Sequence, residues 1–323
     1  ARRPAGRVSG PRRPPRRPAR RRPQPRRAPL DGARLTAFDV LDGVSSRQAY
    51  ANLLLPQLLR ERPDLDARDA AFATQLAYGT LRARGTLDAV LAPLVDRPLA
   101  ELDPRVLDLL RLGAHQLLDL RVPAHAAVAT TVDLTRAIVG AGAAGLVNAV
   151  LRRVAAGDRE HWLRQLGGTG DTALGLATDH PEWIVRAWRD ALGAEDELEA
   201  ALRADDAAPE VHLVARQVPR AELVAESGGQ PGPWSPYAVR LGGGDPGRLA
   251  SVRGGRAGVQ DEGSQLAALA LARAPLDGPD GAWLDVCAGP GGKAALLAAV
   301  RPEGVRLTAA DRSAHRAELV RRA

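Results

Sequence analysis

The sequence predicts a multi-domain fold: an all-α domain, a small α+β module, and the beginning of a doubly wound α/β domain. Three observations predict it. Apolar residues recur at helical spacing from residue 33 to about 156, without a strand pattern. A short alternating segment follows near residue 211, and an apolar segment near residue 282 runs directly into a glycine-rich loop. The expected parts are an Arg/Pro-rich arm (1–29), the helical domain (30–157), the α+β module (158–256) and the α/β segment (257–323).

Length and composition exclude several classes of protein. A chain of 323 residues with 45% hydrophobic residues is long enough for two or three buried cores. A single cysteine rules out a disulfide framework. No apolar run approaches the 18 residues or so of a membrane span, and the N-terminus has no apolar signal region. We therefore expect a cytoplasmic protein without a membrane partner or a bound metal.

The arm at residues 1–29 carries twelve arginines, eight prolines and no acidic residue. The chain as a whole is +7, so the remaining residues sum to −5. Dense proline prevents a helix and like charges repel, so we expect the arm to be extended and disordered. Such an arm is typical of contact with nucleic acid, although a solvated tail of an arginine-rich protein has the same composition.

The helical domain is expected to contain several consecutive amphipathic helices. Leu76, Leu112 and Leu117 are predicted core residues on three apolar faces. Asp69 is a candidate helix cap, and that helix is expected to stop near residues 79–85.

Four segments in this domain resemble the NusB-type RNA-binding helical domain. They are residues 69–82, 110–117, 122–128 and 145–153, in the same order as in that family. The resemblance implies an all-helical RNA-binding fold. By themselves, Asn148, Arg152 and Arg153 are only polar positions on a helix, so their RNA role comes from the resemblance.

The middle module opens with a helix at 182–192, in which Pro181 begins the first turn and Trp183 is expected to anchor the core. Residues 211–215 alternate in the manner of a strand, and residues 219–227 predict a short helix. A loop-rich stretch at 242–255 leads to the next domain.

The most informative stretch is Asp285-Val286-Cys287-Ala288-Gly289-Pro290-Gly291-Gly292-Lys293, which holds the only cysteine and the only lysine of the chain. An apolar strand precedes it, a helix at 294–300 follows, and a second strand at 305–310 ends at Asp311. Glycines at a helix N-terminus let backbone amides approach a ligand, and an acid after the second strand accepts from ribose hydroxyls.

This pattern leaves more than one nucleotide open. Gly289, Gly291 and Ala294 fit the dinucleotide fingerprint, with Asp311 near the expected offset. A P-loop does not fit, because Ala294 stands where Ser or Thr should follow the lysine. S-adenosylmethionine (AdoMet) has the ribose without a phosphate, and Lys293 or the loop amides suit its carboxylate. A strand–helix turn without any ligand is the remaining interpretation.

Residues 285–294 resemble motif I of the RNA cytosine-C5 methyltransferases, and residues 258–266 resemble the segment that precedes it in those enzymes. With a NusB-like domain in front, the chain resembles the Sun/RsmB branch, which implies a Rossmann-like methyltransferase domain, AdoMet as cofactor and small-subunit (16S) ribosomal RNA as partner. The cofactor-binding residues that follow from motif and resemblance are Cys287, Ala288, Gly289, Pro290, Gly291, Gly292, Lys293 and Asp311.

The resemblance does not extend to the catalytic nucleophile. Members of this family attack cytosine C6 with a cysteine from Pro-Cys and Thr-Cys segments downstream of motif I, and neither segment is in these 323 residues. Cys287 occupies the cofactor loop, so no catalytic residue is assigned. We expect an N-terminal fragment of an enzyme, inactive alone. Two interpretations stay open: an rRNA cytosine-C5 methyltransferase, or a NusB-like RNA-binding module without catalytic activity.

Overall fold

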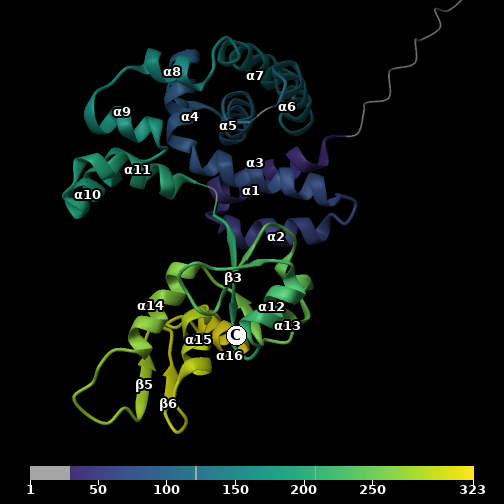
Figure 1. Ribbon diagram of the computed structural model, residues 1–323. Helices are drawn as coiled ribbons and strands as arrows, with labels where there is room; N and C mark the ends of the chain where they lie inside the picture. Colours follow the sequence, from purple (N-terminus) through teal and green to yellow (C-terminus); the bar gives the residue numbers. More distant parts are fainter. Residues whose placement is uncertain (1–29, 121, 208) are drawn as a thin grey trace, which may run out of the picture. The chain divides into compact units, whose positions relative to one another are not determined.

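The computed structural model describes residues 30–120, 122–207 and 209–323 (Figure 1). The arginine-rich arm at 1–29 lies outside the described residues, so its expected disorder stays a prediction. The chain divides into two compact units, one ending at Asp206 and the other spanning Ala207–Ala323. The domain boundaries expected at 157 and 256 concern a finer division and also stay predictions.

The first unit is entirely helical in its described part, as the periodicity predicts (Figure 1). Two short 3-10 helices, η1 (Ala92–Leu94) and η2 (Leu99–Glu101), precede α5. The α-helices are α1 (Gly32–Arg47), α2 (Ala51–Glu61), α3 (Ala67–Arg82), α4 (Arg84–Leu91), α5 (Pro104–Leu118), α6 (Ala124–Ile138), α7 (Ala141–Val154), α8 (Arg159–Leu166), α9 (Gly170–Ala177), α10 (Glu182–Leu192) and α11 (Glu195–Asp206).

Helix α5 is the central helix of this unit, because it packs against α1, α3, α4, α6 and α7. Asp103 caps its first turn by accepting from the amide of Arg105, and Pro104 occupies the first helical position, where no amide is needed. Leu112 and Leu76 of α3 are fully buried in one apolar cluster, as predicted. Leu117 is only partly buried and packs against a second cluster, so the prediction that it is a core residue is confirmed only in part.

One prediction about α3 was wrong. Its cap is Asp66, whose carboxylate accepts from the amide of Asp69, which lies in the first turn. The helix ends at Arg82, in the stretch near residues 79–85 where the sequence predicted its stop. Gly79 itself lies inside the helix, and a Cβ at that position would come within 2.2 Å of Nε2 of His115. The glycine is therefore required by the close approach of α5, which no local pattern reveals.

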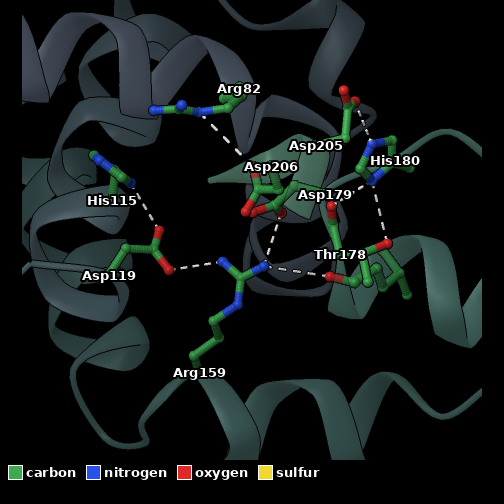
Figure 2. Close-up of polar contacts among 10 residues, drawn as sticks. Arg82, His115, Asp119, Arg159, Thr178, Asp179, His180, Asp205 and Asp206 are labelled. Carbon is green, nitrogen blue, oxygen red and sulfur yellow. Dashed lines mark hydrogen bonds and ion pairs between the residues drawn. The ribbon is translucent and has the colours of Figure 1, made fainter. Parts of the chain in front are cut away.

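A charged network joins α8–α11 to the helices before them (Figure 2). Arg159 at the start of α8 donates to Asp119 at 2.6 Å and to Asp179 at 2.8 Å. Asp119 also contacts Nδ1 of His115 at 2.7 Å. Arg82 of α3 lies 3.8 Å from Asp206 at the end of α11. Ion pairs therefore hold this layer of helices in addition to its apolar contacts.

The pKa values of two carboxyl groups in the network, Asp119 and Asp206, are shifted in opposite directions. Burial acts to raise the pKa of Asp119, but the hydrogen bond from His115 and the charge of Arg159 outweigh it and hold that pKa below its usual range. Burial and the neighbouring carboxylate of Asp179 raise the pKa of Asp206. Asp119 is thus stabilised as an anion by folding, and Asp206 is not.

Helix α10 begins after Pro181 and spans the residues predicted, but the role expected for Trp183 was wrong. Its side chain is 63% exposed, and Val185, with Leu198 and Leu202 of α11, forms the small core instead. The tryptophan therefore lies on an exposed face of α10.

The second unit combines an antiparallel sheet with a parallel strand pair (Figure 1). The first sheet has the order β2-β3-β1-β4, and β5 pairs with β6. The strands are β1 (Val211–Ala215), β2 (Gln230–Pro231), β3 (Ala238–Leu241), β4 (Ala257–Val259), β5 (Ala282–Asp285) and β6 (Arg306–Ala309). The helices are α12 (Arg220–Ser227), η3 (Pro246–Arg248), α13 (Ala250–Arg253), α14 (Glu262–Ala272), α15 (Gly292–Val300) and α16 (Ala314–Arg322).

Strand β1 is covered on both faces. Leu213 and Ala215 pack with α12, whereas Val214 packs with Leu296 and Leu297 of α15. The face of β1 that carries Val214 therefore contacts the glycine-loop helix, which places the antiparallel sheet beside the candidate site.

Candidate functional site

The candidate site lies at the carboxyl edge of the parallel strands β5 and β6. Their register pairs Asp285 with Ala309, so the segments that follow both strands begin side by side. The amide of Ala288 donates to the carbonyl of Ala310 at 2.9 Å, which joins the two segments. In parallel α/β sheets, this edge is where ligands bind.

The side chain of Asp311 contacts the glycine loop directly. One carboxylate oxygen accepts from the amide of Gly289 at 3.0 Å, and the other accepts from the amide of Ser313 at 2.9 Å. These amide contacts, with the charge of Arg316, hold the pKa of Asp311 below its usual range. Arg316 also donates to the carbonyl of Gly289, so acid, loop and arginine form one cluster.

The close packing explains two of the glycines. A Cβ at Gly289 would lie 2.6 Å from the Asp311 carboxylate. Gly291 has φ of +119°, and a Cβ there would meet Ala323 at 2.5 Å. Gly291 is also the N-cap of α15 and brings no side chain to cap it, so the first amides of the helix point at the loop edge without intrahelical partners. Such a cradle suits a ligand with ribose hydroxyls and an anionic group.

The structure brings other predicted site residues together at a second place. Cys287 has an exposed side chain, and its amide donates to the side chain of Asp285 at 3.2 Å. Cys287 and the exposed Lys293 line an open cavity of 230 Å³ whose other walls include Leu284 and Leu297. Asp311 does not line this cavity, so the side chains of Lys293 and Asp311 lie at different places around the glycine loop. Of the remaining predicted residues, Ala288 is buried and Pro290 is exposed.

Sequence reasoning missed two residues of the site. Arg316 gave no signal, because it has the appearance of an ordinary surface arginine on a helix. Gln260 lies in the segment 258–266 that carried the family resemblance, but no role followed from that. The structure places its side chain 3.7 Å from where a Cβ of Gly292 would lie, at the start of α15.

The polar residues of α7 are arranged in two ways. Arg152 donates to the side chain of Asn148 at 3.2 Å, which leaves an exposed polar pair on the helix. Arg153 donates to the carbonyl of Leu94 at 3.0 Å and so also fastens the turn at η1. Within residues 30–120, 122–207 and 209–323, no helix is long and apolar enough to cross a membrane. The same residues contain no group of three or more His, Cys, Asp or Glu side chains placed to hold a metal ion.

Two family profiles match the chain. The NusB family matches residues 31–156, and the family described as 16S rRNA methyltransferase RsmB/F matches residues 271–323. The first match covers α1–α7, and the second contains β5, the glycine loop, α15, β6 and Asp311.

Curated relatives match along most of the chain. A putative methyltransferase of Mycobacterium tuberculosis is 53% identical, over 92% of this chain and 66% of the relative. The probable ribosomal RNA small subunit methyltransferase B of Bacillus subtilis is 31% identical, over 89% and 64%. The ribosomal RNA small subunit methyltransferase B of Xanthomonas campestris is 34% identical, over 86% and 64%. The chain thus spans about two thirds of the length of these relatives.

A solved structure shares the fold. The crystal structure of PH0851 superposes with a TM-score of 0.71 at 16% identity, covering 91% of this chain and 66% of that one. Together with the NusB match, this confirms the predicted fold class of a NusB-like helical domain, a small α+β module and the first part of a Rossmann-like α/β domain.

Proposed function

Because the chain belongs to the RsmB branch of the 16S rRNA methyltransferase RsmB/F family, with a NusB-family domain ahead of it, we propose that it serves AdoMet-dependent methylation of cytosine C5 in small-subunit ribosomal RNA. The contact between Asp311 and the Gly289 amide carries the proposal, because it joins an acid and a glycine loop at the edge where a nucleoside binds. With ribosomal RNA as substrate, we expect the protein in the cytoplasm.

The cradle fits AdoMet. An ionised carboxylate has about four acceptor positions, and the amides of Gly289 and Ser313 use two of those on Asp311. Arg316 lies 3.6 Å from the same carboxylate, and we propose that the ribose hydroxyls donate to the acceptor positions that remain. The lowered pKa keeps Asp311 ionised at neutral pH, so it acts only as an acceptor there. When bound, AdoMet supplies the methyl group for transfer to carbon.

Cys287 is assigned to the cofactor loop and not to the attack on cytosine C6. Its side chain lies at the end of β5 in the cavity with Leu284 and Lys293, and its amide is held by Asp285. No residue of this chain is proposed as the nucleophile.

The test of the proposed reaction is made on RNA. Deleting the gene that encodes this chain in its host and mapping 5-methylcytosine in 16S rRNA by bisulfite sequencing should show the loss of methylation at a cytosine. Restoring the gene should restore the mark, and the Asp311→Ala form should not. An unchanged 16S pattern would contradict the proposal and favour an RNA-binding module without catalytic activity.

Asp311→Ala is expected to weaken AdoMet binding by roughly ten- to a hundredfold, because it removes charge-assisted hydrogen bonds. Asp311→Asn should fall between wild type and alanine, since it keeps one neutral acceptor. Asp277→Ala, at an exposed acid of the loop before β5, is the matched control and should change nothing. Calorimetry on the complete gene product with AdoMet, and separately with NAD, measures this. Tight NAD binding without AdoMet binding would overturn the choice of cofactor.

We also propose that RNA is bound by the NusB-like domain, with Asn148 and Arg152 on its exposed surface, and by the arginine-rich arm. Deleting residues 2–27 is expected to weaken binding to 16S rRNA fragments and to flatten its salt dependence. Each lost phosphate contact should lower the slope of log affinity against log salt by about 0.7–0.9. The control is an arm of equal length with glutamine in place of its twelve arginines. A slope equal to that of the wild type in both variants would exclude the arm from binding.

A further inference from the structure

Trp234 is the most exposed tryptophan of the chain, with 74% of its surface accessible. It lies in the loop between β2 and β3. Among residues 212–258, all of which the structure describes, no other large apolar side chain is exposed. Single exposed apolar side chains are common on proteins, so what distinguishes Trp234 is the way in which its loop is held.

A buried carboxylate fixes this loop. Oε1 of Glu262 accepts from the amides of Trp234 and Ser235, both at 2.6 Å, and Glu262 is only 5% exposed. The hydroxyl of Ser235 donates to the side chain of Gln265 at 2.7 Å. A buried charge costs free energy unless hydrogen bonds compensate it, and two of the bonds that do so here come from the backbone at Trp234. The loop is therefore rigid at Trp234 before any partner binds.

A cationic side chain lies beside the same loop. Nη1 of Arg220, the first residue of α12, donates to the carbonyl of Ser235 at 3.4 Å. Arg240 on β3 is paired with Glu210 at 3.2 Å. Arg220, in contrast, has no acidic partner in the part of the chain that the structure describes. Its charge is therefore available to an anion outside the protein.

An aromatic ring and an unpaired guanidinium side by side match the two parts of a nucleotide. A base stacks on an aromatic face, and a phosphate accepts hydrogen bonds from a guanidinium. The base must be unpaired, because both faces of a base within a duplex are already covered. A protein or membrane partner would need a continuous apolar patch around the indole, and residues 212–258 do not provide one.

We propose that Trp234 and Arg220 bind one unpaired nucleotide of the RNA substrate, with the base on the indole and the phosphate at the guanidinium. The inference rests on the proposed function, because it states that the substrate RNA is single-stranded where it meets this loop. It adds an RNA contact to those proposed for the NusB-like domain and the arm.

The test measures binding of the complete gene product to a short single-stranded RNA of mixed sequence and to the duplex that this RNA forms with its complement. Trp234→Ala should weaken binding of the single strand roughly five- to a hundredfold, which corresponds to the loss of one stacked base. Binding of the duplex should not change. Trp183→Ala is the matched control and should bind as the wild type does, since Trp183 is also exposed, at 63%, but lies on a helix.

Salt dependence separates the two residues of the site. Trp234→Ala should leave the slope of log affinity against log salt unchanged, because the indole carries no charge. Arg220→Gln should lower that slope by about 0.7, the value for one phosphate contact on a single strand.

Tryptophan fluorescence gives a second measurement that does not depend on affinity. Saturating single-stranded RNA should quench the indole emission of the wild type and of Trp183→Phe, and this quenching should be lost in Trp234→Phe.

The nucleotide site is wrong if Trp234→Ala binds the single strand as tightly as the wild type, or if it loses the same affinity for both RNAs. A lower midpoint of thermal unfolding in Trp234→Ala would also contradict it, because that result indicates a structural role. If the wild type binds neither RNA, the proposed RNA substrate itself fails. If the wild type binds RNA and only deletion of the arm changes the binding, the proposed function stands and the nucleotide site fails.

Discussion

Leu112→Ala is expected to lower the free energy of unfolding of the helical unit by about 2–5 kcal/mol. Leu112 lies at the centre of α5 and is fully buried, among residues of α1, α2 and α3. Truncation removes buried methyl groups and leaves a cavity that rigid helices on several sides cannot close. Urea denaturation followed by the far-ultraviolet circular dichroism of the helices measures the change.

Two further leucines serve as a graded comparison for this prediction. Leu117→Ala should cost less than Leu112→Ala, because Leu117 is only partly buried. Leu53→Ala, on α2, should stay within about 0.5 kcal/mol of the wild type, because that side chain is 61% exposed. Equal losses in all three variants would contradict the packing of α5 described here.

Arg159→Met is expected to lower the free energy of unfolding by about 3 kcal/mol, since it leaves two acids without their shared cation. The side chains of Asp119 and Asp179 are only 16% and 8% exposed, so water cannot replace the guanidinium well. Arg136→Met is the control, because its pair with Asp133 is exposed and should contribute little. If both variants lose the same stability, the network of Figure 2 does not hold α8–α11.

The effect of Arg159→Met on stability should also depend on pH. The folded-state pKa of Asp119 is lowered, so its contribution is present above the ordinary carboxyl value of 3.8 and is lost as the pH falls through the lower folded value. The difference in the free energy of unfolding between Arg159→Met and the wild type should therefore become smaller below about pH 4. Asp206 acts in the opposite sense: its pKa is raised, so its protonation favours the folded state as the pH falls towards 3.8.

Local chemistry determined most of the element positions. The apolar spacing of α5 depends only on neighbouring residues, so the sequence alone predicted a helix there. The strand–loop–helix–strand order that ends at Asp311 is local for the same reason. The fold class and the candidate loop could therefore be predicted before any contact was known.

Contacts between distant segments decided the rest. Position 79 requires glycine because His115 approaches from α5. Trp183 is exposed because Val185 and residues of α11 form the core that it was expected to anchor. Asp311 reaches the amide of Gly289 only when β5 and β6 pair. Gln260 meets the start of α15 only because β4 lies beside β1. These positions depend on which elements pack together, and the sequence near each residue carries no record of that packing.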